Sequence, residues 1–353
     1  MPEDTALLQE EVLKLEKKIN ETILPPELKE KTKQMISRLS RMVRFGEYSA
    51  EYEKVALYID WVVNLPWDKR TEDVLDLDRA RSVLDKNHFG LEEIKERILE
   101  YLAVLKLQTG DKGVQSSLRA PILCFVGLVG TGKTTMAYSI AEAMGRKFAR
   151  IPLGGMGDPL DLRGQSRLRP DAEPGQVVKA LRKAGAKNPV ILLDEIDRVA
   201  DEGRSSIMGV LIELLDPEQN FAFRDHFLDY PLDLSEVLFI VTCNNTTNIS
   251  VAVMDRLEPI QMPSYTDEEK ITIGKNYVLP NTMRDMGLEK DNLKVDPEVW
   301  PKIVRPLGYD AGIRTLERTI DGICRKVAKM IVQGKGKQFS VTLENMKDFL
   351  PTW

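Results

Sequence analysis

Apolar residues recur every three or four positions through the first part of the chain, with Glu and Lys between them. This spacing predicts amphipathic helices. Five stretches carry it: Leu7–Ile23, Glu27–Phe45, Glu51–Leu65, Asp76–Asn87 and Leu91–Leu107. Pro25 and Pro26 end the first stretch, and a polar connection follows the last at 108–119. We therefore expect an all-helical region over residues 1–108.

The pattern changes at Pro121, where short continuous apolar runs begin. Such runs are typical of strands that are buried on both faces of a parallel sheet. Five of them alternate with helical segments: Ile122–Val126, Phe148–Leu153, Val190–Leu193, Val237–Val241 and Pro259–Met262. We expect an α/β unit with five strands over residues 109–264, with its functional residues at the strand ends.

Helical spacing returns after Tyr265. The stretches that show it are Asp267–Tyr277, Asp296–Val304 and Ala311–Ile331, and Val341–Leu343 suggests one short strand. Residues 265–353 are therefore expected to form a small, mainly helical domain.

Composition narrows the class of protein. The chain has 50 Lys and Arg against 55 Asp and Glu, a net charge of −5, which argues against a protein that coats nucleic acid. Its 3 isolated Cys and 2 His cannot assemble a four-ligand zinc site at motif spacing and favour a reducing compartment. The apolar runs are far shorter than the ~20 residues that a membrane helix needs.

The first buried strand leads directly into a glycine-rich segment, residues 127–134, that fits G-x-x-x-x-G-K-[ST]. In such a loop, backbone N–H groups converge on phosphate oxygens, Lys133 reaches the β- and γ-phosphates, and the Thr134 hydroxyl ligates Mg²⁺. An ordinary Gly-rich turn is the alternative, which the preceding strand and the helical stripe after the segment disfavour. The predicted nucleotide-binding residues are Gly127, Gly130, Thr131, Gly132, Lys133, Thr134 and Thr135.

The third apolar run ends in two carboxylates, Asp194 and Glu195. Asp194 is predicted to bind the nucleotide and to hold Mg²⁺. Glu195 is predicted to orient and polarise the water that attacks the γ-phosphorus. For Asp197, two residues on, an ordinary surface acid or a helix cap explains the residue as well as a functional role does.

Further segments resemble the Lon proteases, whose ATPase module is of the AAA+ class. The similar segments are Asn64-Leu65-Pro66-Trp67, Gly145-Arg146-Lys147-Phe148, Leu153-Gly154-Gly155, Ala186-Lys187-Asn188-Pro189, Asp216-Pro217-Glu218-Gln219-Asn220 and Phe223-Arg224-Asp225-His226. The resemblance covers essentially the whole chain. It implies an AAA+ five-stranded parallel sheet flanked by helices, an N-terminal helical region and a C-terminal helical lid.

The resemblance also implies roles for three more residues. Asn244 matches sensor 1, which helps to hold the attacking water, although a turn amide would also explain it. Arg256 matches the arginine finger that acts on ATP in the neighbouring subunit, with a surface salt bridge as the alternative. Arg314 matches sensor 2, which faces the nucleotide from the lid. With Glu195, these three are the predicted catalytic residues.

Two departures from the family bear on substrate handling. Arg169 and Pro170 stand where the first pore loop of Lon proteins carries an aromatic and an aliphatic residue, and Gly203 stands where the second carries a bulky one. The Ser-Lys protease domain of the family has no counterpart here. We expect an excised or shortened ATPase module with no peptidase activity of its own.

The leading hypothesis is an Mg²⁺-dependent ATPase that forms a homo-oligomer, normally a hexameric ring in this family. It would move unfolded or damaged polypeptides. Its expected location is the cytoplasm or, in a eukaryote, the mitochondrial matrix. An ATP-switched scaffold or DNA-binding module is the alternative, since Lon proteins bind DNA and basic residues gather near the C-terminus: Arg318, Arg325, Lys326, Lys329, Lys335 and Lys337. A solvated helix face is the default interpretation of such a run in a chain of negative net charge. A generic P-loop ATPase such as a clamp loader shares the core but not the flanking motifs.

Overall fold

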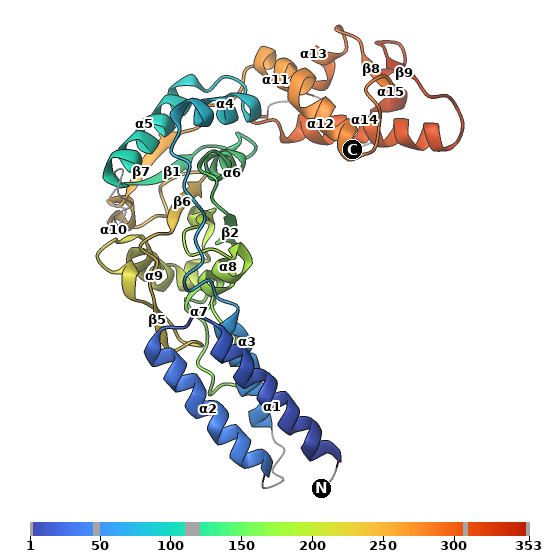
Figure 1. The fold of residues 1–353 in the computed structure, drawn as a ribbon. Coiled ribbons are helices and arrows are strands. Elements are labelled where there is room, and N and C mark those ends of the chain that lie inside the picture. The colour runs from blue at the N-terminus through green and yellow to red at the C-terminus, as the bar shows by residue number, and fades with distance from the viewer. Residues whose placement is uncertain (1–2, 45–49, 110–120, 306–309, 351–353) are drawn as a thin grey trace.

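The computed structural model describes residues 3–44, 50–109, 121–305 and 310–350. From residue 110 on, the expected polar connection at 108–119 lies outside this described part. The α/β unit stands between an N-terminal helical hairpin and a C-terminal lid (Figure 1). No helix in the described ranges is long and apolar enough to cross a bilayer.

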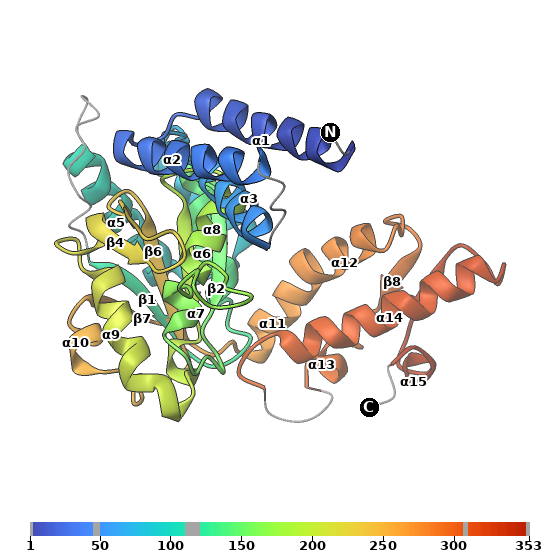
Figure 2. The ribbon, with the colours of Figure 1, turned by 90° about the horizontal axis from the view of Figure 1, so that it is seen from below.

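Three helices form the N-terminal end: α1 (Glu3–Glu21), α2 (Pro26–Arg44) and α3 (Ala50–Val63). The helices α1 and α2 lie antiparallel and side by side in Figures 1 and 2. Their apolar stripes, which include Val12, Ile19, Leu28 and Ile36, are buried and join the core on one face of the sheet. Burial of these stripes is what stabilises the long helices, since isolated helices of this kind are marginal in water.

The helices α4 (Leu77–Asn87) and α5 (Glu92–Thr109) pack on the other face of the sheet. Asp76 caps α4 by accepting a hydrogen bond from the backbone N–H of Arg79 at 3.0 Å. Leu84 and Ile98 share a core with strand residues of the α/β unit. These two helices therefore form part of its helical layer.

The five expected strands form one parallel sheet in the order β2-β3-β6-β1-β7, which confirms the α/β prediction. Their bounds lie within two residues of the predicted runs: β1 (Ile122–Val126), β2 (Phe148–Pro152), β3 (Val190–Asp194), β6 (Leu238–Cys243) and β7 (Leu257–Gln261). Alternate residues of β1 enter opposite cores, Cys124 on one face and Phe125 on the other. Two-sided burial explains the continuous apolar runs.

The other elements of the α/β unit connect these strands. They are α6 (Lys133–Met144), α7 (Leu160–Arg163), α8 (Gln176–Ala184), α9 (Arg204–Leu215) and α10 (Val251–Met254), with a hairpin of β4 (Phe223–Asp225) and β5 (Tyr230–Leu232). The sequence pattern did not predict this hairpin, because strands of 3 residues show too little alternation to recognise.

The lid contains α11 (Asp267–Ile273), α12 (Leu279–Asp285), α13 (Trp300–Ile303), α14 (Arg314–Val332) and α15 (Met346–Phe349). It extends away from the α/β unit in Figure 2. The single helix expected at Asp267–Tyr277 instead passes through a π-helical turn, Gly274–Val278, into α12. A Cβ at Gly274 would lie 2.6 Å from the Trp300 ring, so this turn needs glycine. A short strand, β9 (Phe339–Val341), begins two residues before the expected Val341–Leu343, and it pairs in parallel with an unpredicted β8 (Leu293–Val295).

Candidate nucleotide-binding site

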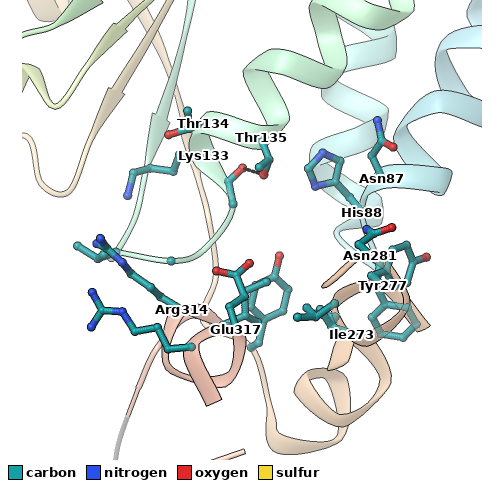
Figure 3. Close-up of a pocket in the computed structure, with 18 of the residues that line it drawn as sticks. Asn87, His88, Lys133, Thr134, Thr135, Ile273, Tyr277, Asn281, Arg314 and Glu317 are labelled. Carbon is teal, nitrogen blue, oxygen red and sulfur yellow. Dashed lines mark hydrogen bonds between the residues drawn. The ribbon is translucent and has the colours of Figure 1, made fainter. Parts of the chain in front are cut away.

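A pocket of about 690 Å³ lies at the carboxyl ends of the central strands, between the α/β unit and the lid. Because β1, β3 and β6 are parallel neighbours, the loops that follow them meet at one edge of the sheet. Figure 3 shows Lys133 and Thr134 on one side of this pocket and Arg314 and Glu317, from the lid, facing them. The predicted site residues that line it are Gly130, Gly132, Lys133, Thr134, Thr135, Asp194, Glu195, Asn244 and Arg314.

Glycine is required at three positions of the loop between β1 and α6. Gly130 and Gly132 have φ of 82° and 95°, in the left-handed region. Gly127 does not line the pocket; a Cβ there would lie 2.7 Å from the carbonyl oxygen of Met262. Thr131 is buried and donates its hydroxyl to the Leu128 carbonyl at 2.9 Å. Thr131 and Gly127 therefore support the loop from the side away from the pocket, and the first N–H groups of α6 face the pocket.

Lys133 reaches back across this loop. Its ammonium donates to the Leu128 carbonyl at 2.9 Å and to Asn244 Oδ1 at 3.1 Å. Burial lowers the pKa of Lys133, and the nearby carboxylates of Asp194 and Asp197 oppose that shift. The charge is thus held beside the loop whose N–H groups would receive a phosphate.

Asp194, at the end of β3, is buried and has a partner on each neighbouring strand. Arg150, on β2, donates from Nε to Asp194 Oδ2 at 2.6 Å, and its Nη2 forms an ion pair with the same oxygen at 2.6 Å. Thr242, on β6, donates its hydroxyl to Oδ1. The same Thr242 oxygen accepts the Glu195 N–H at 3.1 Å, so Thr242 fixes both acids at once.

Glu195 follows the strand with φ of 59°, an unusual conformation for a residue other than glycine. The turn directs its carboxylate along the pocket edge toward Arg198, whose Nη1 lies 3.5 Å from Oε1. A Cβ at Gly154 would lie 2.9 Å from Glu195 Oε2, so glycine there leaves room for the acid. The carboxylate stays partly exposed and can contact a water in the pocket.

Asn244 links Lys133 to Asp197. Its amide nitrogen lies 3.4 Å from Asp197 Oδ2, while its oxygen accepts from Lys133. Asp197 is buried, and its Oδ1 has no hydrogen-bond partner within the described residues. Of the interpretations that the sequence left open for Asp197, the surface acid and the helix cap are therefore wrong. The short 3₁₀ turn Ile196–Arg198 folds it back under the strand ends.

The lid touches the phosphate-binding loop directly. The N–H of Ile313 donates to the Gly130 carbonyl at 3.1 Å, and Tyr265 donates its hydroxyl to the Thr131 carbonyl at 3.3 Å. A Cβ at Gly312 would lie 2.3 Å from the Gly130 carbonyl carbon. This backbone contact sets Arg314, the first residue of α14, at the pocket wall.

Arg256 does not line the pocket. Its guanidinium pairs with Asp216 Oδ2 at 2.8 Å and donates to the Ala252 carbonyl at 2.7 Å. The hydrogen bond from Arg256 holds the pKa of the Asp216 carboxyl below its usual range. The structure therefore brings Asn244 and Arg314 together with the phosphate loop, but not Arg256.

Sequence reasoning missed the far end of the pocket, which α4 and the lid form. Asn87, His88 and Phe89 line it together with Tyr277. Figure 3 shows Asn87 and His88 on the side of the pocket that faces Tyr277. His88 lies 2.9 Å from the Ser139 hydroxyl, and burial lowers its pKa to about 4, so the ring is neutral at pH 7. The only sequence signal here was the helix end at Phe89-Gly90. A neutral imidazole and two aromatic rings at this end suit a nucleobase.

The basic residues near the C-terminus occupy different environments. Arg318 lines the pocket, Arg325 pairs with Asp321 at 3.0 Å, and Lys326 donates to the Asp348 carbonyl at 2.8 Å. Intramolecular partners account for Arg325 and Lys326, and Arg318 faces the pocket, which weakens the case for a nucleic-acid surface.

The residues at the predicted pore positions differ in their exposure to solvent. Arg169 and Pro170 are exposed, and the neighbouring Leu168 is 93% exposed. Gly203 is buried instead, and a Cβ there would lie 1.8 Å from the carbonyl oxygen of Gly157. Close backbone packing against Gly157 therefore requires glycine at position 203.

The donor set suits Mg²⁺ bound together with a nucleotide. Thr134 offers a hydroxyl oxygen and Asp194 a carboxylate, the hard oxygen donors that Mg²⁺ prefers. Within the described residues, no group of three or more His, Cys, Asp or Glu side chains could hold a metal ion. Most ligands of an ion here would come from phosphate oxygens and water, which is the usual arrangement for Mg²⁺ in nucleotide sites.

Comparison with known proteins agrees with this geometry. The family model "ATPase family associated with various cellular activities (AAA)" matches residues 123–265, and the model "Lon protease AAA+ ATPase lid domain" matches residues 284–339. The chain is a Lon-type AAA+ module. Together these two matches cover the sheet, the phosphate-binding loop and most of the lid.

Similar curated proteins carry the same name. The chain is 44% identical to a Lon protease of Elusimicrobium minutum over 342 residues, which are 97% of this chain and 40% of that relative. It is 44% identical to Lon protease 1 of Bacillus subtilis over 96% of this chain, and 42% identical to Lon protease 2 of Thermus thermophilus over 97%. This Lon-type module spans about 40% of the length of these relatives.

Proposed function

We propose that this module binds and hydrolyses Mg²⁺-ATP and couples the cycle to the unfolding and movement of polypeptides in an ATP-dependent protease. One observation carries the proposal: groups from three adjacent strand ends and from the lid line one pocket. They are Lys133, Asp194, Glu195, Asn244 and Arg314. Each has the charge or the hydrogen-bonding group that phosphoryl transfer from a nucleotide needs.

Binding would use the backbone first. The N–H groups at the start of α6 and the loop before it receive the β- and γ-phosphates, and Lys133 turns from the Leu128 carbonyl to a phosphate oxygen. The base lies toward His88 and Tyr277. Thr134 and Asp194 would hold Mg²⁺, which neutralises charge on the phosphate oxygens.

Hydrolysis would depend on Glu195 and Asn244. Glu195 accepts a hydrogen bond from the attacking water and orients it toward the γ-phosphorus, while Asn244, held between Lys133 and Asp197, fixes the water from the side. Thr242 keeps Glu195 in its left-handed turn. Arg314 stabilises charge on the phosphates from the lid, so occupancy and lid position are linked.

The position of Arg256 supports assembly. It lies outside the pocket of its own subunit, so a role in hydrolysis requires a second subunit. We propose a homo-oligomeric ring of six subunits, as the resemblance to Lon proteins implies. Arg256 of one subunit then reaches the γ-phosphate of ATP bound to the next subunit. Arginine supplied in this way is worth ~10³ to 10⁵ in rate.

Unfolded or damaged polypeptides are the proposed substrates, and the cytoplasm is the proposed location. Support comes from the relatives named Lon protease and from the exposed turn at Leu168, Arg169 and Pro170. This turn offers one apolar side chain and one cation to a passing chain, in place of the expected aromatic and aliphatic pair.

Glu195→Gln is the direct test. The variant should bind ATP with wild-type affinity and lose turnover by at least about 10²-fold, since the amide cannot accept a proton from water. The wild-type specific activity should rise with protein concentration as subunits assemble. Parental turnover in Glu195→Gln would remove the water-positioning role, and activity that is independent of concentration would contradict assembly.

A further inference from the structure

Arg150 is a pocket residue that neither the motifs nor the proposed reaction uses. It projects from β2, one of the two edge strands of the five-stranded sheet, toward Asp194 on the neighbouring β3. Its Nε and Nη2 both lie 2.6 Å from Asp194 Oδ2. Thr242 donates to the other oxygen, so the chain's own donors occupy both oxygens of the acid that is expected to serve Mg²⁺.

The two partners differ in freedom to move. The Asp194 side chain is 5% exposed, whereas that of Arg150 is 51% exposed. A buried carboxylate is costly without a cation, so Asp194 needs a positive partner at all times. A half-exposed arginine can leave at little cost because water receives its guanidinium.

A metal ion and Arg150 would compete for the same oxygen. Two cations within hydrogen-bonding distance of one carboxylate oxygen repel each other, so an ion at Asp194 Oδ2 displaces the guanidinium. The displaced group stays in the pocket, which Lys133 and Arg314 also line. Guanidinium groups bind phosphate oxygens in a bidentate manner, so the polyphosphate is the natural new partner.

We propose that Arg150 is an exchangeable cation of the nucleotide site, which neutralises Asp194 until Mg²⁺ replaces it and then contacts the polyphosphate. This inference rests on the proposed nucleotide site. It has a signature that a purely structural role lacks: Arg150 strengthens binding of metal-free nucleotide and opposes the entry of Mg²⁺. Its removal should therefore shift the two affinities differently.

The test is the Kd of fluorescently labelled ADP, measured in EDTA and in excess Mg²⁺, for the wild type and for Arg150→Gln. We expect Kd in EDTA to rise by up to about fivefold, because the Asp194 charge is then no longer neutralised by Arg150 and repels the polyphosphate. Kd in Mg²⁺ should change less than about twofold, because relief of the competition offsets the lost phosphate contact. In Arg150→Gln, the Mg²⁺ concentration that gives the half-maximal change in labelled-ADP binding should be lower than in the wild type. Arg150→Lys, which keeps the charge without the fork, should lie between the two.

Arg70→Gln is the matched control, because Arg70 forms a similar pair with Glu236 at 2.7 Å outside the pocket. This control should alter neither Kd. A double-mutant cycle with Asp194→Asn tests whether Arg150 acts through Asp194. In the Asp194→Asn background, Arg150→Gln should no longer change the ratio of the Kd in EDTA to the Kd in Mg²⁺.

Equal weakening of both Kd values by Arg150→Gln, or no change in either, would overturn the exchange. A change of ratio that persists with Asp194→Asn would overturn it as well, because the effect would not run through that acid. Wild-type protein that binds labelled ADP in neither condition would contradict the nucleotide site itself. A failure of the proposed function is thus distinct from a failure of this inference.

Discussion

Thr242→Val removes one hydroxyl from the centre of the sheet and keeps the shape of the side chain. Thr242 is fully buried on β6, and its hydroxyl donates to Asp194 Oδ1 and accepts the Glu195 N–H. Valine satisfies neither group. The variant therefore leaves a charged oxygen one donor short and a backbone N–H without its acceptor.

The expected cost follows from those two groups. A hydrogen bond to a charged group contributes about 1.5–3 kcal/mol, and an unsatisfied buried N–H costs about 1–3 kcal/mol. Valine recovers part of this, because no hydroxyl has to be desolvated on folding. We expect the free energy of unfolding to fall by about 2–4 kcal/mol.

Thr32→Val is a matched control. Thr32 is also fully buried, on α2, whose Leu28 and Ile36 belong to the same core as β6 residues. Its hydroxyl donates only to helix carbonyls, at 2.9 Å to that of Leu28, and this carbonyl keeps its own helical N–H partner. The loss should be below about 0.5 kcal/mol.

Urea unfolding, followed by tryptophan fluorescence, measures both variants; Trp61 and Trp67 report on the core shared by α2 and β6, and Trp300 reports on the lid. The rings of Trp61 and Trp67 pack against this shared core, so they report on its unfolding. Equal m-values would show that the comparison concerns stability alone. If Thr242→Val falls within about 0.5 kcal/mol of Thr32→Val, the hydroxyl bridge between the two acids carries no net stability and the reasoning fails.

Three further predictions concern the lid, the base end and assembly. Gly312→Ala should weaken nucleotide binding about tenfold or more, because the added Cβ would lie 2.3 Å from the Gly130 carbonyl carbon. Gly209→Ala is the control and should leave the affinity unchanged, since a Cβ there meets open space. Calorimetric titration measures the Kd of both variants. Burial lowers the pKa of His88 to about 4 from 6.5, so the unfolded state binds the extra proton between these values and stability falls as pH drops through that window. His88→Gln should flatten the pH dependence of Tm there. Arg256→Ala and Glu195→Gln should each be inactive, and mixing them should restore ATPase activity, since one subunit then supplies the arginine and the other the acid; an inactive mixture would contradict action across subunits.

The strands and the order of the motifs could be predicted because their signals are local. Because β1, β3 and β6 are buried on both faces, they are continuous apolar runs in the sequence. Polar residues that directly follow such a run can therefore be assigned to the end of a strand. Hence Lys133 and Glu195, which were expected at strand ends, do line one pocket.

Arg150 and Thr242 could not be found in this way. Their contact with Asp194 depends on β3 lying between β2 and β6, and the run of strands along the chain does not reveal their order in the sheet. In isolation, an arginine in a strand and a threonine near a strand end are ordinary residues. Only the pairing of strands far apart in sequence makes them partners of one acid.

Gly203 shows how a departure from a family pattern can have a packing cause. The sequence suggests a lost substrate contact, because glycine replaces a bulky side chain at a pore position. In the structure, the backbone of Gly203 packs so closely on Gly157 that no side chain fits. A bulky residue there would require the segment around Gly157 to move as well. Position 203 therefore needs glycine for packing, whereas a Cβ at Gly157 would meet only Ala200, at 3.6 Å. If the module holds a polypeptide as proposed, we expect the contact at the exposed turn of Leu168 and Arg169.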